Sequence, residues 1–145
     1  MDLLVATLCD KAEEIQGKLN VIGAFDAIIG SSFPAQFSFS LALRFYFTPK
    51  DKGPHSFSII LLDETENQNA KPPQEAEITV NMPPDATGFA TQNMITPLNG
   101  SVQKAGIYHF VIRLDGKIVA RVPLRVIEQP GAAGVPNIAD IPQLT

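Results

Sequence analysis

The stretch AGIYHFVIRLDGKIVARVPLRV, residues 105–126, alternates apolar and polar residues on both sides of an Asp-Gly pair. Alternation with a period of two is typical of a half-buried β-strand, and an Asp-Gly pair favours a tight turn. The stretch therefore predicts a β-hairpin. Its first strand would turn the even-numbered residues from Tyr108 to Leu114 toward the core, and its second strand would do the same from Ile118 to Leu124.

The register of this hairpin follows from parity. Two residues that lie opposite each other in a sheet share a face. Because the expected core residues of both strands are even-numbered, the numbers of two paired residues must add to an even sum. A two-residue loop at Asp115-Gly116 would instead pair Phe110 with Arg121. We therefore predict a three-residue loop, Leu114 to Gly116, with Gly116 in the left-handed conformation. Pro123 cannot donate a backbone hydrogen bond, which favours an edge position for the last strand.

The rest of the chain also alternates with a period of two, and twelve prolines and ten glycines interrupt it. Leu3–Cys9 is the first expected strand, extended through Ala12–Ile15, although a short helix at Lys11–Gln16 is an open alternative. A tight turn is expected at Gln16-Gly17. The further expected strands are Lys18–Ile29, Phe37–Phe47 with its odd residues inward, a central strand His55–Asp63, Glu75–Met82, and Asn93–Leu98 followed by a turn at Asn99-Gly100.

About eight short strands with almost no helix predict an all-β fold, an antiparallel two-sheet β-sandwich. The expected domain is 1–127, followed by a Pro/Gly/Ala-rich tail, 128–145. Gly106-Ile107-Tyr108-His109-Phe110 resembles the Gly-x-Tyr-x-Cys of immunoglobulin-type domains, with Phe110 in place of the cysteine. The resemblance implies an immunoglobulin-like sandwich in which the Tyr108 hydroxyl bonds a backbone group a few residues upstream.

A longer resemblance covers residues 3 to 127. The order of LCDKAEEIQGKLNVIGAFD, FSLALRFYF, AGIYHFVIRLDGK and VARVPLRV is similar to a family of small bacterial proteins that is described only as a domain of unknown function. The resemblance implies a β-sandwich. It carries no assigned activity, cofactor or catalytic residue.

Composition and charge exclude several classes of function. The net charge is −4 and the eleven Lys and Arg residues are scattered, so nucleic acid is not an expected partner. The start of the chain lacks the basic residues and long apolar core of a signal peptide, which favours a cytoplasmic protein. No apolar stretch approaches the ~20 residues of a membrane span. Cys9 is the only cysteine and ends an apolar strand, so we expect a packed side chain and not a reactive thiol.

We predict a non-enzymatic binding or interaction module, with a second copy of the chain among its candidate protein partners. No catalytic, cofactor-binding or metal-binding residue is predicted, and no cofactor. The tail repeats apolar residues at every third position, the period of polyproline II. The predicted interaction surface combines outward residues of the final hairpin with this apolar stripe: His109, Val111, Arg113, Val119, Arg121, Arg125, Val135, Ile138, Ile141 and Leu144.

Two other classes of function remain open. A hydrolase or small-ligand site could be built from the loop residues His55, Asp63, Glu64 and Asp85, if they meet in one pocket. A calcium-dependent membrane-binding module could instead use the carboxylates of the acidic segment 63–77, since calcium binds carboxylate oxygens. Those carboxylates belong to Asp63, Glu64, Glu66, Glu75 and Glu77.

Overall fold

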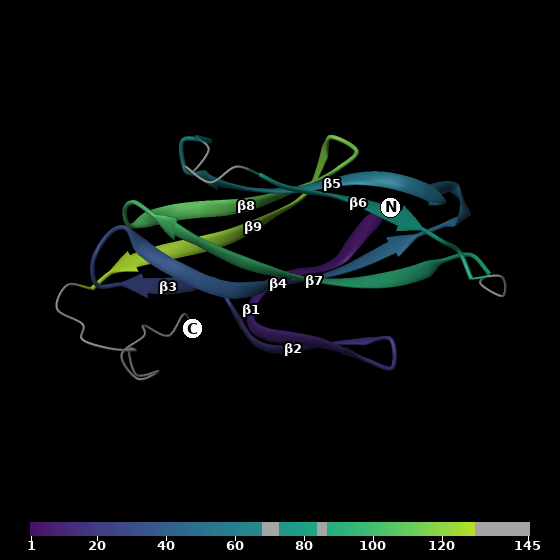
Figure 1. Cartoon of the computed structure of the whole chain (residues 1–145), viewed down its shortest axis with the longest axis horizontal. Helices are drawn as coiled ribbons and strands as arrows, with labels where there is room; N and C mark the ends of the chain where they lie inside the picture. Colours follow the sequence, from purple (N-terminus) through teal and green to yellow (C-terminus); the bar gives the residue numbers. More distant parts are fainter. Residues whose placement is uncertain (68–72, 84–86, 130–145) are drawn as a thin grey trace.

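The computed structural model describes residues 1–67, 73–83 and 87–129, which form nine β-strands and one 3-10 turn (Figure 1). The strands are β1 (Asp2–Ile15), β2 (Lys18–Phe25), β3 (Ala27–Gly30), β4 (Ala35–Phe47), β5 (Gly53–Asp63), β6 (Gln74–Val80), β7 (Ala90–Val102), β8 (Gly106–Leu114) and β9 (Lys117–Glu128). The 3-10 turn, Pro49–Asp51, joins β4 to β5. The all-β prediction is confirmed, whereas the alternative of a helix at Lys11–Gln16 is wrong because β1 stays extended to Ile15.

The strands form two sheets that pack against each other, which confirms the two-layer prediction. One sheet has four strands in the order β2-β1-β4-β7, and the other has five in the order β3-β9-β8-β5-β6. In Figure 1, strands β5, β6 and β8 of the five-stranded sheet lie above β4 and β7. Neighbouring strands are antiparallel except β3 and β9, which are parallel. β5 lies between β6 and β8, so it is a central strand as predicted.

The core lies between the sheets and follows the alternation of the sequence. On β4, Phe39, Leu41, Leu43, Phe45 and Phe47 are buried, and Phe37 is partly buried against the same core. They face alternate residues of β5, β8 and β9, including those from Tyr108 to Leu114. Each fully buried side chain of this size contributes about 1.5–3 kcal/mol relative to exposure. The Tyr108 hydroxyl donates to the Lys104 carbonyl over 2.7 Å, which confirms the upstream bond that the sequence predicted. The immunoglobulin-like topology stays a prediction.

The turn between β8 and β9 has two residues, so the predicted three-residue loop is wrong. Asp115 and Gly116 both have positive φ, 50° and 79°, as a type I′ turn requires, and Leu114 pairs with Lys117. The parity requirement is met further along β9. Register shifts between Ile112, which pairs with Ala120, and Arg113, which pairs with Ile118.

Val119 is the extra residue of this bulge. From Ala120 onward the even-numbered residues of β9 face the core, as predicted, and Val122 and Leu124 are buried. Before the bulge the pattern is inverted. Ile118 is 44% exposed instead of buried, and Val119 packs against the core instead of facing outward.

The segment Lys18–Ile29, expected as one strand, divides at Asp26 and changes sheets. β2 pairs with β1, whereas β3 pairs with the last four residues of β9, Arg125–Glu128. The Arg125 N–H donates to the Asp26 carbonyl over 2.7 Å at the point of entry. The predicted edge position of the last strand is therefore wrong for 125–128. Within the described chain, residues 117–124 of β9 have no strand partner on that side, and there the prediction is confirmed.

Beyond Cys9, where β1 stops pairing with β4, the β1–β2 hairpin folds back over the outer face of β4 and β7. Its tip is the predicted tight turn, where Gln16 and Gly17 have φ of 54° and 76°. In Figure 1 the hairpin runs along β4 and β7 on the side away from the five-stranded sheet. There Arg44 and Asn93 both donate to the Gly17 carbonyl, over 3.3 and 3.1 Å. Ala42, which also points to this outer face, is fully buried.

Candidate functional site

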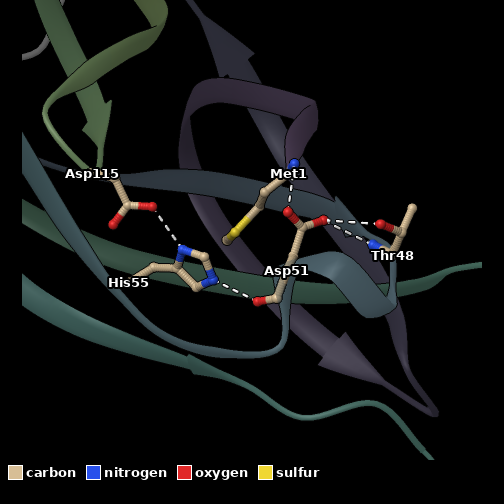
Figure 2. Close-up of polar contacts among 5 residues, drawn as sticks. All are labelled: Met1, Thr48, Asp51, His55 and Asp115. Carbon is tan, nitrogen blue, oxygen red and sulfur yellow. Dashed lines mark hydrogen bonds and ion pairs between the residues drawn. The ribbon is translucent and has the colours of Figure 1, made fainter.

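A polar network closes one end of the sandwich around His55 (Figure 2). Odd residues of β5 such as Phe57 point into the core, and His55 lies on the same face where the core ends; its side chain is 16% exposed. The Nδ1 atom of His55 lies 2.7 Å from a carboxylate oxygen of Asp115. The Nε2 atom bonds the backbone carbonyl of Asp51. His55 thus bridges the β8–β9 turn and the 3-10 turn.

Local backbone geometry positions both acidic residues. The type I′ turn presents Asp115, whose other carboxylate oxygen accepts the Ser56 N–H over 3.0 Å. Asp51 ends a capping box, in which its carboxylate accepts the Thr48 N–H over 2.9 Å. The amine of Met1 also donates to the Asp51 carboxylate, over 3.2 Å. The network therefore connects the beginning of β1, the 3-10 turn, β5 and the β8–β9 hairpin.

The arrangement favours a charged imidazole. Both ring nitrogens face acceptors, and a neutral imidazole can donate from only one nitrogen, whereas an imidazolium donates from both. The hydrogen bond to Asp115 raises the pKa of His55 above its ordinary 6.5, with a further contribution from the Asp51 carbonyl. The same bond, together with the Ser56 N–H, lowers the pKa of Asp115, and the Thr48 N–H lowers that of Asp51.

This geometry cross-links segments and does not prepare a nucleophile. An activating base needs a nucleophilic side chain within hydrogen-bond reach. Among the described residues, the partners of His55 are a carboxylate and a backbone carbonyl. The neighbouring Ser56 lies on the opposite face of β5, as alternation requires, and lines a depression on the outer surface.

The sequence indicated His55 but missed its two partners. Asp115 is 60 residues away, and no local pattern connects the two positions. Asp51 carried a usable signal, because Thr48-x-x-Asp51 has the form of a capping box and predicts a short helical turn just before His55.

The alternative ligand site does not assemble as one pocket. His55 and Asp63 stand at opposite ends of β5, and eight residues of extended chain span roughly 26 Å. Glu64 follows Asp63 at the far end, and Asp85 lies outside the described residues. His109 pairs with Leu62, also far from His55. The proposed grouping of His55 with Asp63 and Glu64 is therefore wrong.

The acidic segment proposed for calcium is also dispersed. An Asp63 carboxylate oxygen accepts bonds from Thr65 and Asn67, and these bonds lower the pKa of Asp63. Glu66 forms an ion pair with Arg121 over 3.3 Å, whereas Glu75 and Glu77 lie on β6. Across residues 1–67, 73–83 and 87–129, no group of three or more His, Cys, Asp or Glu side chains is placed to hold a metal ion.

The predicted interaction surface falls partly on the outer face of the five-stranded sheet. Arg113, Arg121 and Arg125 are exposed there, and His109 is half-buried. Val111 is 0% exposed, so its assignment to the surface is wrong. It lies mid-sheet on β8 between Ile60 of β5 and Arg121 of β9, and Arg121 forms an ion pair with Glu66, which follows the end of β5.

Two further corrections concern β9 and the tail. Val119 packs toward the core because of the bulge, and the exposed Ile118, which sequence reasoning placed inside, takes its position on the outer face. Val135, Ile138, Ile141 and Leu144 lie outside the described residues. The interaction role of the surface stays a prediction.

Two open depressions mark the surface near these residues. The first, of about 560 Å³, lies over β5, β6 and β8 and is lined by Ser56, Phe57, Ser58, Glu75, Ala76, Glu77, Arg113 and Gly116. The second, of about 470 Å³, lies beside the unpaired part of β9 and is lined by Ala6, Thr7, Ala24, Phe25, Asp26, Val122 and Pro123.

Cys9 is fully buried, and its Sγ atom lies 3.7 Å from the Ser40 carbonyl. Burial raises the pKa of the thiol, and the nearby Asp10 carboxylate adds to this effect. A raised thiol pKa disfavours the reactive thiolate. The expectation of a packed, unreactive cysteine agrees with this environment.

The described residues include no helix that is long and apolar enough to cross a membrane.

Comparison with known proteins identifies the family to which the chain belongs. A search of curated proteins found no match to the chain. The model of a family of unknown function, DUF6941, matches residues 4–127, in agreement with the resemblance found in the sequence. The chain therefore belongs to the DUF6941 family of unknown function.

Proposed function

We propose that this domain is a protein-binding module that associates with a second copy of itself through the outer face of its five-stranded sheet. The observation that carries the proposal is the exposed side-chain set of β8 and β9, in which the exposed Ile118 lies opposite Arg113, and Arg121 and Arg125 follow further along β9. Arginine is enriched in protein interfaces, where its long stem packs while its guanidinium bonds carboxylates.

Charge complementarity favours a second copy as the partner. Ser58 on β5 pairs with Glu75 on β6 and with Arg113 on β8, so these three residues form one row across the sheet. The basic and acidic ends of the row lie two strands apart, roughly 10 Å. A twofold axis that runs parallel to β5 and above its outer face would place Arg113 of each copy opposite Glu75 of the other. Such a contact is self-complementary, as a twofold interface requires.

The C-terminal tail extends this surface in the proposal. Residues 130–145 follow β9 in the sequence, and their apolar stripe from Val135 to Leu144 would supply apolar contact area, which charged pairs do not provide. Exposed ion pairs contribute only about 0–1 kcal/mol each, so a stable contact also needs apolar area. The tail is therefore expected to increase affinity, while the charged row sets the geometry.

A charge-swap experiment tests the proposal. Molar mass would be measured by light scattering over a wide concentration range for the full chain, R113E, E75R and the double variant. We expect a dimer for the full chain, weakened at least tenfold by either single change and restored in R113E/E75R. The control K18E changes an exposed lysine on β2, away from this face. A full chain that stays monomeric throughout overturns the proposal, and so does a double variant that remains as weak as the singles.

A chain ending at Gln129 completes the set. This truncation should weaken the dimer and leave its charge-swap pattern unchanged. Equal dimerisation with and without the tail would remove residues 130–145 from the proposed surface.

A further inference from the structure

We propose that His55 forms a proton-dependent bridge between the β8–β9 turn and the Pro49–Asp51 turn, and that loss of its proton removes one of the restraints on the end of the hairpin that carries the contact face. The bridge itself stands on hydrogen-bond geometry. Its effect on binding rests on the proposed function.

The first step is the position of the bridge. Asp115 and Ser56 form a reciprocal pair of bonds, in which the Asp115 N–H donates to the Ser56 carbonyl over 2.9 Å and the Ser56 N–H donates to the Asp115 carboxylate over 3.0 Å. The remaining carboxylate oxygen of Asp115 binds His55. The tip of the hairpin is thus fixed to β5, and the His55 ring connects it further to the Asp51 carbonyl of the 3-10 turn.

The second step is the charge around the ring. The charged groups that face His55 are the Asp115 carboxylate from the β8–β9 turn and, through the 3-10 turn, Asp51, whose carboxylate binds the Met1 amine. Two carboxylates and one amine surround one imidazole, and the charged ring balances this set. The positive ring also donates at both ends, so charge and hydrogen bonding favour the same protonation state.

The third step is the consequence of proton loss. A neutral ring keeps one N–H, and the other nitrogen then presents a lone pair to an acceptor. Two facing acceptors repel, so one of the two contacts must open, whichever tautomer forms. In either case the ring no longer connects the two turns. The turn that carries Asp115, whose side chain is 54% exposed, then keeps its two bonds to Ser56 but loses its connection to the 3-10 turn.

The fourth step links the bridge to the contact face. Arg113 and Ile118 pair with each other two positions from the Asp115-Gly116 turn, and both lie on the outer face of the sheet. A shift of Asp115 and Gly116 therefore moves the residues that the proposed dimer would use. Protonation of His55 adds a restraint on these residues, and deprotonation removes it.

The experiment follows the protons directly. The two histidine ring signals and the backbone amide of Gly116 would be titrated by NMR in the full chain at concentrations where it is monomeric. We expect His55 to titrate above 6.5, its ordinary value, and the Gly116 amide shift to follow the same midpoint. His109, which pairs with Leu62 near the other end of β5 and lies away from this network, serves as the reference in the same spectrum.

Two variants keep the test independent of any folding defect. D115N removes the carboxylate and retains a side chain that suits the turn, and it should move the His55 midpoint downward. H55Q should abolish the change of the Gly116 amide shift at the His55 midpoint and leave only the change at low pH that titration of the neighbouring Asp115 causes. Titration of His55 at or below its ordinary value overturns the bridge, as does a Gly116 shift that ignores the His55 midpoint.

A second readout separates this inference from the proposed function. Dimer affinity would be measured on both sides of the His55 midpoint for the full chain and for H55Q. We expect the full chain to weaken at least threefold above the midpoint, and H55Q to show no such step. If His55 and Gly116 titrate together but affinity is constant, the link to binding is overturned. If no dimer forms at any pH while they titrate together, the proposed function fails and the bridge stands.

Discussion

At the scale of single residues, Gly100 shows how one side chain can override a local signal. Asn99-Gly100 predicted a turn, because Asn-Gly is a strong turn pair. That prediction is wrong: both residues lie within β7, and Gly100 pairs with Phe37 on β4. The Phe37 ring occupies the space where a side chain would stand, with its Cζ atom 2.8 Å from the position of an ideal Cβ. Glycine is required here for close packing and not for a turn.

We therefore expect Gly100→Ala to destabilise the fold, although alanine suits a strand better than glycine does. The Phe37 ring stacks on Phe39 with centroids 4.9 Å apart and meets the edge of Phe110, so it cannot move without disturbing the core. Overpacking of this kind costs about 1–3 kcal/mol. Urea unfolding measures the loss. The control is the same change in a Phe37→Leu background, where the cost should fall to near zero; an equal cost in both backgrounds would refute the explanation.

His55 marks the limit of prediction at this scale. Its place at the start of a strand was readable, because the segment that follows alternates clearly. Its role was not, since the partner Asp115 becomes a neighbour only when β5 and β8 pair. A residue whose chemistry depends on a partner 60 positions away cannot be interpreted from local pattern alone.

At the scale of elements, the β1–β2 hairpin depends on Arg44. One guanidinium nitrogen of Arg44 lies 2.6 Å from the Asn93 side-chain oxygen and also reaches the Gly17 carbonyl at the hairpin tip. The other donates to the Thr91 hydroxyl over 2.9 Å. Arg44→Met keeps most of the apolar stem and removes all three bonds. Since hydrogen bonds to a charged group contribute about 1.5–3 kcal/mol, we expect a loss of about 2 kcal/mol.

The location of the damage checks this prediction. Hydrogen exchange should accelerate for the amides of Lys18 and Leu19, next to the tip, and stay unchanged in β8. Arg125→Met is the matched control. Arg125 is exposed, and its side chain forms no hydrogen bond or ion pair with the residues that the structure describes. Faster exchange throughout the molecule would instead mean a general loss of stability and would count against a local role.

Elements also show what alternation can and cannot determine. Alternation predicted the strands and most of the inward residues, because a buried face must repeat every second position. It also established that β8 and β9 must absorb one extra residue. It could not place that residue. A three-residue loop and a bulge at Val119 both turn the even-numbered residues of β9 from Ala120 onward toward the core, so the pattern does not distinguish them. The misassignment of Ile118 and Val119 follows from this single ambiguity.

At the scale of the whole molecule, the two-layer sandwich was predictable and its connections were not. Apolar faces on every strand require two sheets to cover each other. The parallel pairing of β3 with β9 joins segments almost a hundred positions apart, and nothing in either segment specifies the other. The sheet change at Asp26 has no compositional signal for the same reason. Covering of the outer face by the β1–β2 hairpin likewise depends on distant partners.

Stability of the whole molecule should peak in mildly acidic solution. The pKa values of Asp51, Asp63 and Asp115 are lowered from 3.8, so their stabilisation is complete above that value and is lost as the pH falls through the lowered values. The pKa of His55 is raised from 6.5, so its stabilisation is complete below 6.5 and is lost as the pH rises through the raised value. Both contributions are present together between these limits.

Urea midpoints measured across pH should therefore be highest at about pH 5 and fall on both sides. H55Q should flatten the fall on the alkaline side. It should also reduce the fall on the acid side, because the bond to His55 is the main cause of the lowered Asp115 pKa, whereas Asp51 and Asp63 keep their lowered pKa values. D115N should reduce both slopes, since it removes one lowered carboxylate and the main cause of the raised histidine pKa. A full chain that grows more stable from about pH 5 to about pH 8 would contradict the assigned charge state of His55.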